Sequence, residues 1–564
     1  MAYNSSHTGA QIDDAVGKVI EKSGTWDNKQ DKIKGKKGQY AGFTADNVLG
    51  AVNAPSSGGG SIITITFATD FVGQTWTLKG GGETYTGTVD SSKTATVSVL
   101  GINTTYTLSA ALSGTTYTTE VTTKAYYTAL SVNLEKFQST ITVTVDSGST
   151  VTATLGSTVL TKTSTGTAVF TVGKAGTWAI KATKGNQTAE GTVEITASGQ
   201  SKSLTLSYAN VFGVCWDTSN SSTALTRLTP STDPYGLVTR SVTTEPKPAV
   251  GTGSGSSPFD SYAPWSGMRE CNLNASGTVT AWKGDSGFSR SNNFTMVFIP
   301  EFYVAAKRNG TKQYFYVSDK PKTGMTKHPG SGKYVGRYTI PGSKSGVTST
   351  VNITRTTARS NAKKNGDKWH LYDFATYCAI IFLYVVEFAD WNCQITIGAG
   401  VTKSEYSGHV RNGMTDTMIY HTGNSTAGSS ECAVQYRWIE NLWGNVYQWV
   451  DGFNVNGITA YYCTDPSKYA DDTATGYTNI GTLPASGWIN DLTVTDNGLL
   501  IPKTTGGSDS TYIPDFATSL TGWRVLCVGG NWNEGTYAGL LSFNASTSSS
   551  GSYSNVSARL LCEA

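Results

Sequence analysis

Residues that commonly carry chemistry occur in this chain without the spacings that a reaction needs. No two histidines have HxxxH or HExxH spacing and no two cysteines form a CxxC pair, so the sequence predicts no metal site and no cofactor. GxSxG and P-loop motifs are absent, and the glycine-rich run at 251–255 is not followed by a helical pattern. Carboxylates are too numerous to pair from sequence, so a glycosidase pair stays open. The histidines and cysteines are His7, His328, His370, His409 and His421, and Cys215, Cys271, Cys378, Cys393, Cys432, Cys463, Cys527 and Cys562.

The segment 531–555 has the composition of a binding surface. It is almost uncharged and consists largely of Asn, Ser, Thr, Gly, Tyr and Phe. Tyr and Phe give contact area at low entropic cost, and Ser, Asn and Gly adapt their hydrogen bonds to a ligand. Trp532, Leu540 and Leu541 punctuate the segment with apolar anchors, which the simpler alternative, a solvated low-complexity loop, would not need.

Three motifs precede and follow this segment, at 444–450 (GNVYQWV), 524–532 (RVLCVGGNW) and 557–560 (SARL). In this order they resemble the recurring strands of the formylglycine-generating-enzyme branch of the C-type lectin fold. The segments 256–260, 264–268, 298–303 and 386–391 are similar to phage-encoded members of that branch. Its catalytic members carry two neighbouring cysteines late in the domain, whereas residues 529–557 contain none. The resemblance therefore implies the scaffold without oxidase activity, and we expect no enzyme.

The spacing across 529–561 is also similar to the variable region of proteins diversified by retroelements. In those proteins, adenine-specific mutagenesis of AAC-type codons yields the residue types that dominate this segment. Glu534 fits least, because it needs a different parent codon or a fixed position. The contact set implied by the resemblance is Asn533, Glu534, Thr536, Tyr537, Ser542, Phe543, Asn544, Ser546, Thr547, Gly551 and Tyr553. The implied scaffold is Gly529, Gly530, Trp532, Gly539, Leu540, Arg559 and Leu560.

The elements that must position these residues differ along the chain. Period-two alternation at 63–67 returns at 141–145, and the pattern at 105–108 returns at 177–180, so the sequence predicts an internal repeat of β-domains. We expect immunoglobulin-like sandwiches at 61–128 and 129–207, acting as spacers, with carbohydrate binding as the alternative. For residues 208–564 we expect one large domain with its clearest helix over 373–389, and the resemblance implies an α+β C-type lectin fold for it. The expected fold class is mostly β and multidomain.

Residues 1–60 predict a head and a linker. Apolar residues at 12, 15, 16, 19 and 20 form one stripe of a short helix, which needs copies of itself, a partner or its own downstream domain to cover it. The run at 54–60 predicts a flexible linker. Residues 7–13 are similar to the starts of phage tail-fibre proteins, and this resemblance implies attachment to other tail proteins and a homotrimer.

Composition excludes several classes of protein. The 43 basic and 40 acidic residues give a net charge of +3 without a basic stripe, so we expect no nucleic-acid partner. No apolar run reaches the ~18 residues of a membrane span, so we expect no membrane insertion. The first residues lack the regions of a secretory signal peptide. Aromatic residues at 11% argue against intrinsic disorder.

These observations together predict a phage tail receptor-binding protein, or adhesin, located in the virion at the tail fibre or tip. Its partner would be a host cell-surface receptor, either protein or glycan. Two alternatives stay open. A tail-borne glycan hydrolase predicts carboxylates clustered in one cleft, and a structural virion protein predicts a C-terminal domain without variable binding.

Overall fold

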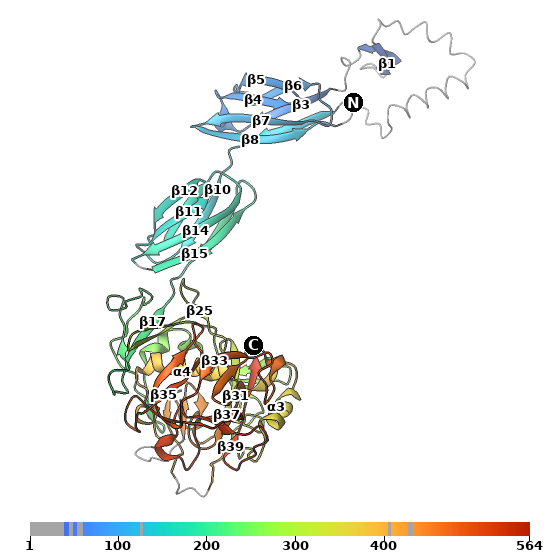
Figure 1. The fold of residues 1–564 in the computed structure, drawn as a ribbon. Helices are drawn as coiled ribbons and strands as arrows, with labels where there is room; N and C mark the ends of the chain where they lie inside the picture. Colours follow the sequence, from blue (N-terminus) through green and yellow to red (C-terminus); the bar gives the residue numbers. More distant parts are fainter. Residues whose placement is uncertain are drawn as a thin grey trace, which may run out of the picture. The chain divides into compact units, whose positions relative to one another are not determined.

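A computed structural model describes residues 39–43, 49–53, 60–124, 128–185, 187–403, 408–426 and 433–564 (Figure 1). The described chain is mostly β and forms several separate sheets, which confirms the expected fold class. Near the start, β1 (Gln39–Phe43) and β2 (Leu49–Asn53) pair antiparallel. The helical stripe expected at 12–20 lies outside the described residues.

Two seven-stranded β-sandwiches follow. The first contains β3 (Ser61–Phe67), β4 (Thr75–Gly80), β5 (Glu83–Thr88), β6 (Thr94–Val99), β7 (Thr105–Leu112), β8 (Thr115–Thr122) and β9 (Ala129–Leu134), with the 3-10 helix η1 (Thr69–Phe71) after β3. The second contains β10 (Ser139–Thr144), β11 (Thr150–Leu155), β12 (Thr158–Thr163), β13 (Thr167–Val172), β14 (Gly176–Lys184), β15 (Gln187–Ile195) and β16 (Ser201–Thr205). In both, the four-stranded sheet has the second, third, fifth and sixth strands, and the three-stranded sheet has the first, fourth and seventh.

The repeat seen in the sequence corresponds to equivalent core positions. Ile63 on β3 and Ile141 on β10 are both fully buried, and Tyr106 on β7 and Trp178 on β14 are both buried on the fifth strand of their sandwich. The first strand of each sandwich lies between the fourth and seventh, and pairs in parallel with the seventh. An immunoglobulin constant domain places its first strand in the sheet of strands two, four and five, so the strand order here is a distinct version of the sandwich.

The boundary expected between the sandwiches at residue 128 is wrong by several residues. Strand β9 begins at Ala129 and pairs in parallel with β3, so it completes the first sandwich rather than opening the second. The first sandwich therefore extends through Leu134, and β10 opens the second at Ser139. Sequence alternation does not assign a strand to a sandwich, because β9, the last strand of the first sandwich, pairs with β3, its first strand.

Residues Ser207–Ala564 belong to one compact unit, and its described residues form four sheets. The first sheet has the order β18 (Thr226–Arg227), β17 (Val211–Asp217), β24 (Lys312–Ser318), β23 (Tyr303–Asn309), β25 (Thr326–Lys327). The second has the order β19 (Ala249–Val250), β28 (Gly423–Asn424), β29 (Val434–Tyr436), β30 (Ile439–Glu440). The third has the order β21 (Val279–Trp282), β20 (Arg269–Leu273), β22 (Thr295–Ile299), β26 (Lys333–Thr339), β40 (Arg559–Glu563), β27 (Trp369–Leu371).

The fourth sheet of this unit contains β38, which lies within the segment 531–555. Its order is β33 (Thr478–Thr482), β32 (Thr459–Tyr462), β31 (Tyr447–Asn456), β37 (Trp523–Val528), β38 (Phe543–Thr547), β36 (Ile513–Ser519), β34 (Gly487–Val494), β35 (Leu500–Thr505), with β39 (Val556–Ser557) paired to β31. The 3-10 helices of the unit are η2 (Pro258–Ser261), η3 (Trp265–Gly267), η4 (Pro466–Lys468) and η5 (Gly535–Tyr537). Its α-helices are α3 (Arg355–Lys363), α4 (Phe374–Phe388) and α5 (Cys393–Thr396).

Helix α4 is the helix that the sequence predicts over 373–389. Asp373 caps its N-terminus by accepting a hydrogen bond from the backbone amide of Thr376 at 2.7 Å. Ala389 ends it in the left-handed conformation, at φ 51°. Every residue of α4 is buried, rather than one stripe, because β17 and β24 of one sheet and β31 of another pack against it. The helix is thus the centre of the core of this unit.

Candidate ligand-binding surface

The three motifs that precede and follow the segment meet in space. Strands β37 and β39 both pair with β31 (Figure 1). On β31, Gln448 pairs antiparallel with Val528 of β37 and parallel with Ser557 of β39. The side-chain carbonyl of Gln448 also accepts a hydrogen bond from Arg559 Nε at 2.8 Å. Residues more than 100 positions apart thus form one framework, and the chain between β37 and β39 leaves and returns to it.

Backbone hydrogen bonds from outside the segment hold the first half of this connection. The amide of Trp532 donates to the carbonyl of Asn445 at 3.1 Å, and the amide of Gly535 donates to the carbonyl of Thr402 at 2.8 Å. On α5, the side chain of Gln394 donates to the carbonyl of Gly535 at 3.0 Å and also to that of Ala538. These bonds fix the path of the main chain whatever side chains it carries.

The second anchor of the connection is a buried carboxyl group on β36. Asp515 accepts a hydrogen bond from the amide of Leu541 at 2.6 Å, and Cys393 Sγ accepts one from the amide of Leu540 at 3.2 Å. Burial raises the pKa of Asp515 to about 8. A Cβ on Gly539 would lie 1.9 Å from the carboxyl oxygen of Asp515, so only glycine fits there.

The structure divides the predicted contact set into three groups. Exposed side chains lie at Asn533, Thr536, Tyr537 and Tyr553. Half-buried side chains lie at Glu534, Asn544, Ser546 and Thr547. Buried residues lie at Ser542, Phe543 and Gly551. The exposed group agrees with a surface that meets a ligand, and the buried group corrects the prediction.

The three buried residues are buried for different local reasons, and only Phe543 lies on β38, an interior strand of a large sheet. Phe543 points into the core, where its ring centroid lies 5.5 Å from that of Phe453. Ser542 is buried where its carbonyl accepts the amide of Gly529 at 3.1 Å. The Tyr553 ring covers Gly551. Composition alone does not separate Phe543 from Tyr537, because only strand pairing determines which ring faces the core.

Glu534, which fits the diversified codon pattern least, has a hydrogen bond within the protein. Its carboxylate accepts a hydrogen bond from the side-chain amide of Asn531 at 3.0 Å. The side-chain oxygen of Asn531 in turn accepts the amide of Asn533 at 3.0 Å. Burial raises the pKa of Glu534. The half-buried carboxylate therefore shapes the turn before η5, which agrees with a fixed position.

The predicted scaffold residues occupy constrained places. Gly529 and Gly530 have φ of 94° and 76°, and a Cβ on Gly530 would lie 2.5 Å from that of Ala538. Trp532 is half-buried, with its ring 5.7 Å from His409. Leu540 and Leu560 are buried.

Arg559 on β40 is the most heavily bonded scaffold residue. Its buried guanidinium donates to the carbonyls of Gly336 at 2.6 Å, Arg337 at 2.7 Å and Glu440 at 2.7 Å. Because β26 and β30 come from distant parts of the chain, this side chain joins them to the last strand.

Sequence reasoning missed an aromatic cluster beside η5. Tyr537 stacks on Phe516 of β36 with ring centroids 4.5 Å apart and planes at 29°. Trp488 of β34 meets both rings edge-on, at 5.0 Å from Tyr537 and 5.4 Å from Phe516. Trp488 and Phe516 are half-buried cross-strand neighbours. They lie outside 529–561, and no spacing in the sequence connects them to Tyr537.

A separate open cleft of about 590 Å³ contains three carboxylates, Glu301, Asp465 and Glu563. Glu301 pairs with Lys327, and Glu563 pairs with Lys333 at 3.1 Å. Hydrogen bonds from the Ser467 hydroxyl, the Lys468 ammonium group and the Ser467 amide lower the pKa of Asp465 to about 2. A glycosidase acid needs a raised pKa to hold its proton, so Asp465 does not suit that role.

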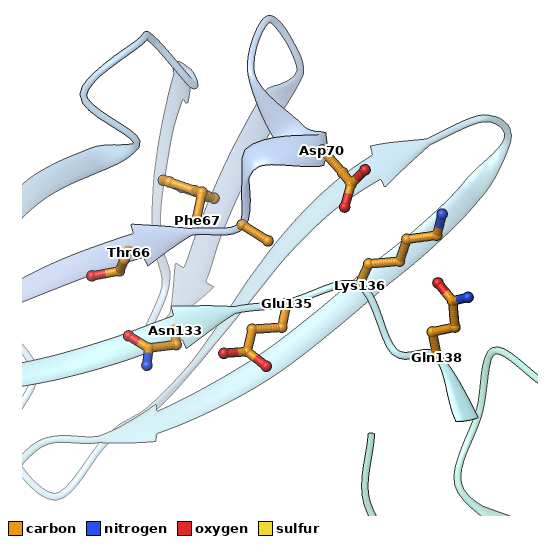
Figure 2. Close-up of a pocket in the computed structure, with 8 residues that line it drawn as sticks. Thr66, Phe67, Asp70, Asn133, Glu135, Lys136 and Gln138 are labelled. Carbon is orange, nitrogen blue, oxygen red and sulfur yellow. The ribbon is translucent and has the colours of Figure 1, made fainter. Parts of the chain in front are cut away.

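A smaller hollow of about 270 Å³ lies at one end of the first sandwich, where β3 and β9 end (Figure 2). Asp70, Asn133, Glu135 and Lys136 surround it, and all four side chains are exposed. Long exposed side chains lose entropy when a ligand orders them, so this hollow is poorly prepared for binding.

Cysteines in the described residues lie mostly inside the protein. Cys527 and Cys562 are fully buried on β37 and β40, and burial raises the pKa of Cys562 to about 12. The described ranges contain no group of three or more His, Cys, Asp or Glu residues placed to hold a metal ion. In the same ranges, no helix is both long and apolar enough to cross a membrane.

No family model and no curated protein matches this chain. It is similar to the solved TIE protein of Bacillus anthracis at 13% identity, covering 32% of this chain and 42% of that one, with a TM-score of 0.14. The chain thus spans less than half of that protein. A streptococcal ancillary pilin is similar at 13% identity, with 31% and 73% covered and a TM-score of 0.16. A putative adhesin from Bacteroides ovatus is similar at 10% identity, with 26% and 89% covered and a TM-score of 0.17. At these TM-scores the likeness extends to neither function nor partner.

Proposed function

We propose that this chain is a phage tail receptor-binding protein that displays a diversified host-binding surface on a C-type lectin scaffold. The observation that carries the proposal is that the main chain and the side chains of 532–541 have separate roles. Residues outside this stretch hold its main chain, while the side chains of Asn533, Thr536 and Tyr537 are exposed. Such side chains can change without loss of the hydrogen bonds that shape the surface.

The scaffold part of the proposal draws support from β31, β37 and β39. The segments that resemble the C-type lectin branch are adjacent strands, and Arg559 ties the final motif to Gln448 of the first. No reaction is part of the proposal. The sandwiches would act as spacers, and the N-terminal residues would attach the chain to other tail proteins as a homotrimer. Several copies on one virion would strengthen weak single-site binding through avidity.

The first test is deep sequencing of codons 529–561 across a population of the phage or prophage that carries this gene. We expect substitutions confined to adenine-derived positions, concentrated at Asn533, Thr536 and Tyr537. Gly539 should stay fixed because a Cβ there would collide with the carboxyl group of Asp515. Arg559 should stay fixed because its guanidinium donates to three backbone carbonyls. Substitutions that are rare, or spread evenly over all bases, would contradict diversification.

A second measurement separates the alternatives. The full chain is added to host cells, and bound protein and released sugar are measured together. Binding without sugar release supports the adhesin. Release of soluble sugar would favour the hydrolase and direct attention to the cleft around Glu301, Asp465 and Glu563. Neither binding nor release would favour a structural virion protein.

A further inference from the structure

The aromatic cluster joins the changeable segment to fixed strands. Trp488 on β34 and Phe516 on β36 belong to the sheet, whereas Tyr537 belongs to η5. Tyr537 is 45% exposed although it contacts both other rings. One side of its ring is therefore covered by the protein and the remainder is open to a ligand.

The four chain segments that meet at the cluster carry little charge. Four segments come together here: α5 touches η5 through Gln394, and the start of β34 meets the end of β36 through Ser486 and Ser519. Glu534 is the one charged residue in these segments, which are 393–400, 484–490, 516–522 and 532–538. Its carboxylate is half-buried and bonded to Asn531. The surface therefore offers rings and neutral hydrogen-bonding groups rather than charge.

This combination matches an uncharged sugar ring. A hexopyranose presents C–H bonds on one face, whose partly positive hydrogens suit the negative face of an aromatic ring, and hydroxyls around its edge. Asn533 and Thr536 are exposed beside Tyr537 and provide hydrogen-bonding groups for those hydroxyls. An anionic or cationic ligand would find no exposed counter-charge in the four segments.

We propose that Trp488, Phe516 and Tyr537 form a stacking site for an uncharged hexopyranose unit of a host surface glycan. The proposal rests on the proposed function of the same surface and names its ligand class. Trp488 and Phe516 would be the fixed part of the site. Variation at 533, 536 and 537 would then change which sugar is preferred while the floor of the site stays the same.

The test is saturation-transfer NMR on the full chain with methyl glucopyranoside, methyl galactopyranoside and methyl mannopyranoside, and glucuronic acid as the charged comparison. A single sugar ring should bind with a Kd on the order of 1 mM, since its contact area is small. We expect a signal from at least one neutral glycoside, concentrated on its C–H face, and none from glucuronic acid. No signal from the three neutral glycosides would overturn the proposal.

The variants are Tyr537→Ser and Trp488→Leu, with Tyr235→Ser as the matched control. Tyr235 is 39% exposed and packs edge-on against Tyr314 and Tyr316, outside both the cluster and the predicted contact set. We expect the signal to fall at least fivefold in the first two variants and to stay unchanged in the control. Tyr537→Ser decides the matter if Trp488→Leu fails to fold, because backbone bonds hold η5 independently of that ring. Equal signals in Tyr537→Ser and wild type would overturn the proposal.

A cell-binding arm separates this inference from the proposed function. Host cells are treated with periodate, which cleaves vicinal diols of sugars, or with protease, before the full chain is added. Loss of binding after periodate alone supports the glycan. Loss after protease alone, with Tyr537→Ser also impaired, would keep the receptor-binding function and overturn the sugar site. No binding to untreated cells would overturn both.

Discussion

The two sandwiches and the C-terminal unit are stabilised in different ways. In each sandwich, alternate residues of short strands face inward, and the described ion pair there, Lys181 with Glu190, is exposed. The C-terminal unit buries charged groups, such as Arg437 with Glu387. Alternation is enough in the sandwiches, where two sheets of regular strands face each other across an apolar core. Where distant loops and short strands meet in the C-terminal unit, side chains with several donors, such as Arg559, bond backbone carbonyls that have no strand partner.

The largest expected effect tests this contrast directly. Arg559→Ala removes donors from three buried carbonyls at once, and each unsatisfied group costs about 1–3 kcal/mol, so we expect a loss of about 4 kcal/mol or more in the C-terminal unit. Calorimetry of the full chain should show a lower unfolding temperature for that unit and an unchanged sandwich transition.

The control for this substitution is Arg411→Ala. Arg411 is an exposed arginine of the same unit, so its loss should change the free energy of unfolding by less than about 0.5 kcal/mol. Equal effects at the two positions would mean that buried arginine does not distinguish the two regions.

A second prediction sharpens the comparison within the proposed variable segment. Phe543→Ala should lower the free energy of unfolding by about 3 kcal/mol, because it leaves a cavity beside Phe453. Tyr537→Ala should cost less than about 1.5 kcal/mol, since much of its ring is already exposed. Chemical denaturation measures both, and cell binding should be lost in Tyr537→Ala without loss of fold. Similar stability losses would place both rings in the core.

The smallest expected effect depends on pH. Burial raises the pKa of Asp515 to about 8, so the folded state keeps its proton where the unfolded state, with a pKa near 4, has lost it. This contribution to stability is fully present below about pH 4 and is lost as pH rises towards 8. Asp515→Asn cannot ionise, so it should gain about 2 kcal/mol relative to wild type between pH 6 and pH 8. Thermal unfolding at pH 5, 6, 7 and 8 measures this, and parallel curves for the two proteins would contradict it.

Much of the fold was predictable because its signals are local. The alternation at 63–67 and 141–145 identifies strands of both sandwiches, and the apolar stripe at 373–389 identifies α4 with its Asp373 cap. The assignment of β9 was not predictable, because its alternation fits a strand at the edge of either sandwich.

The candidate site was predictable only in part. Composition marks 531–555 as unusual, and Asn533, Thr536 and Tyr537 are exposed there. It does not show that Phe543 faces the core, or that Trp488 and Phe516 lie against Tyr537. Those contacts depend on the parallel pairing of β36 with β38 and the antiparallel pairing of β34 with β36.

By itself, the sequence determined the residue types of the surface, the repeat of the sandwiches and the position of the central helix, since each depends on neighbours within a few residues. Tertiary structure decided which aromatic rings are buried, which form the exposed cluster, and which carbonyls Arg559 holds. The physical reason is that burial and ring contact depend on strand partners dozens to hundreds of residues away, and a one-residue change in register would turn each side chain to the opposite face.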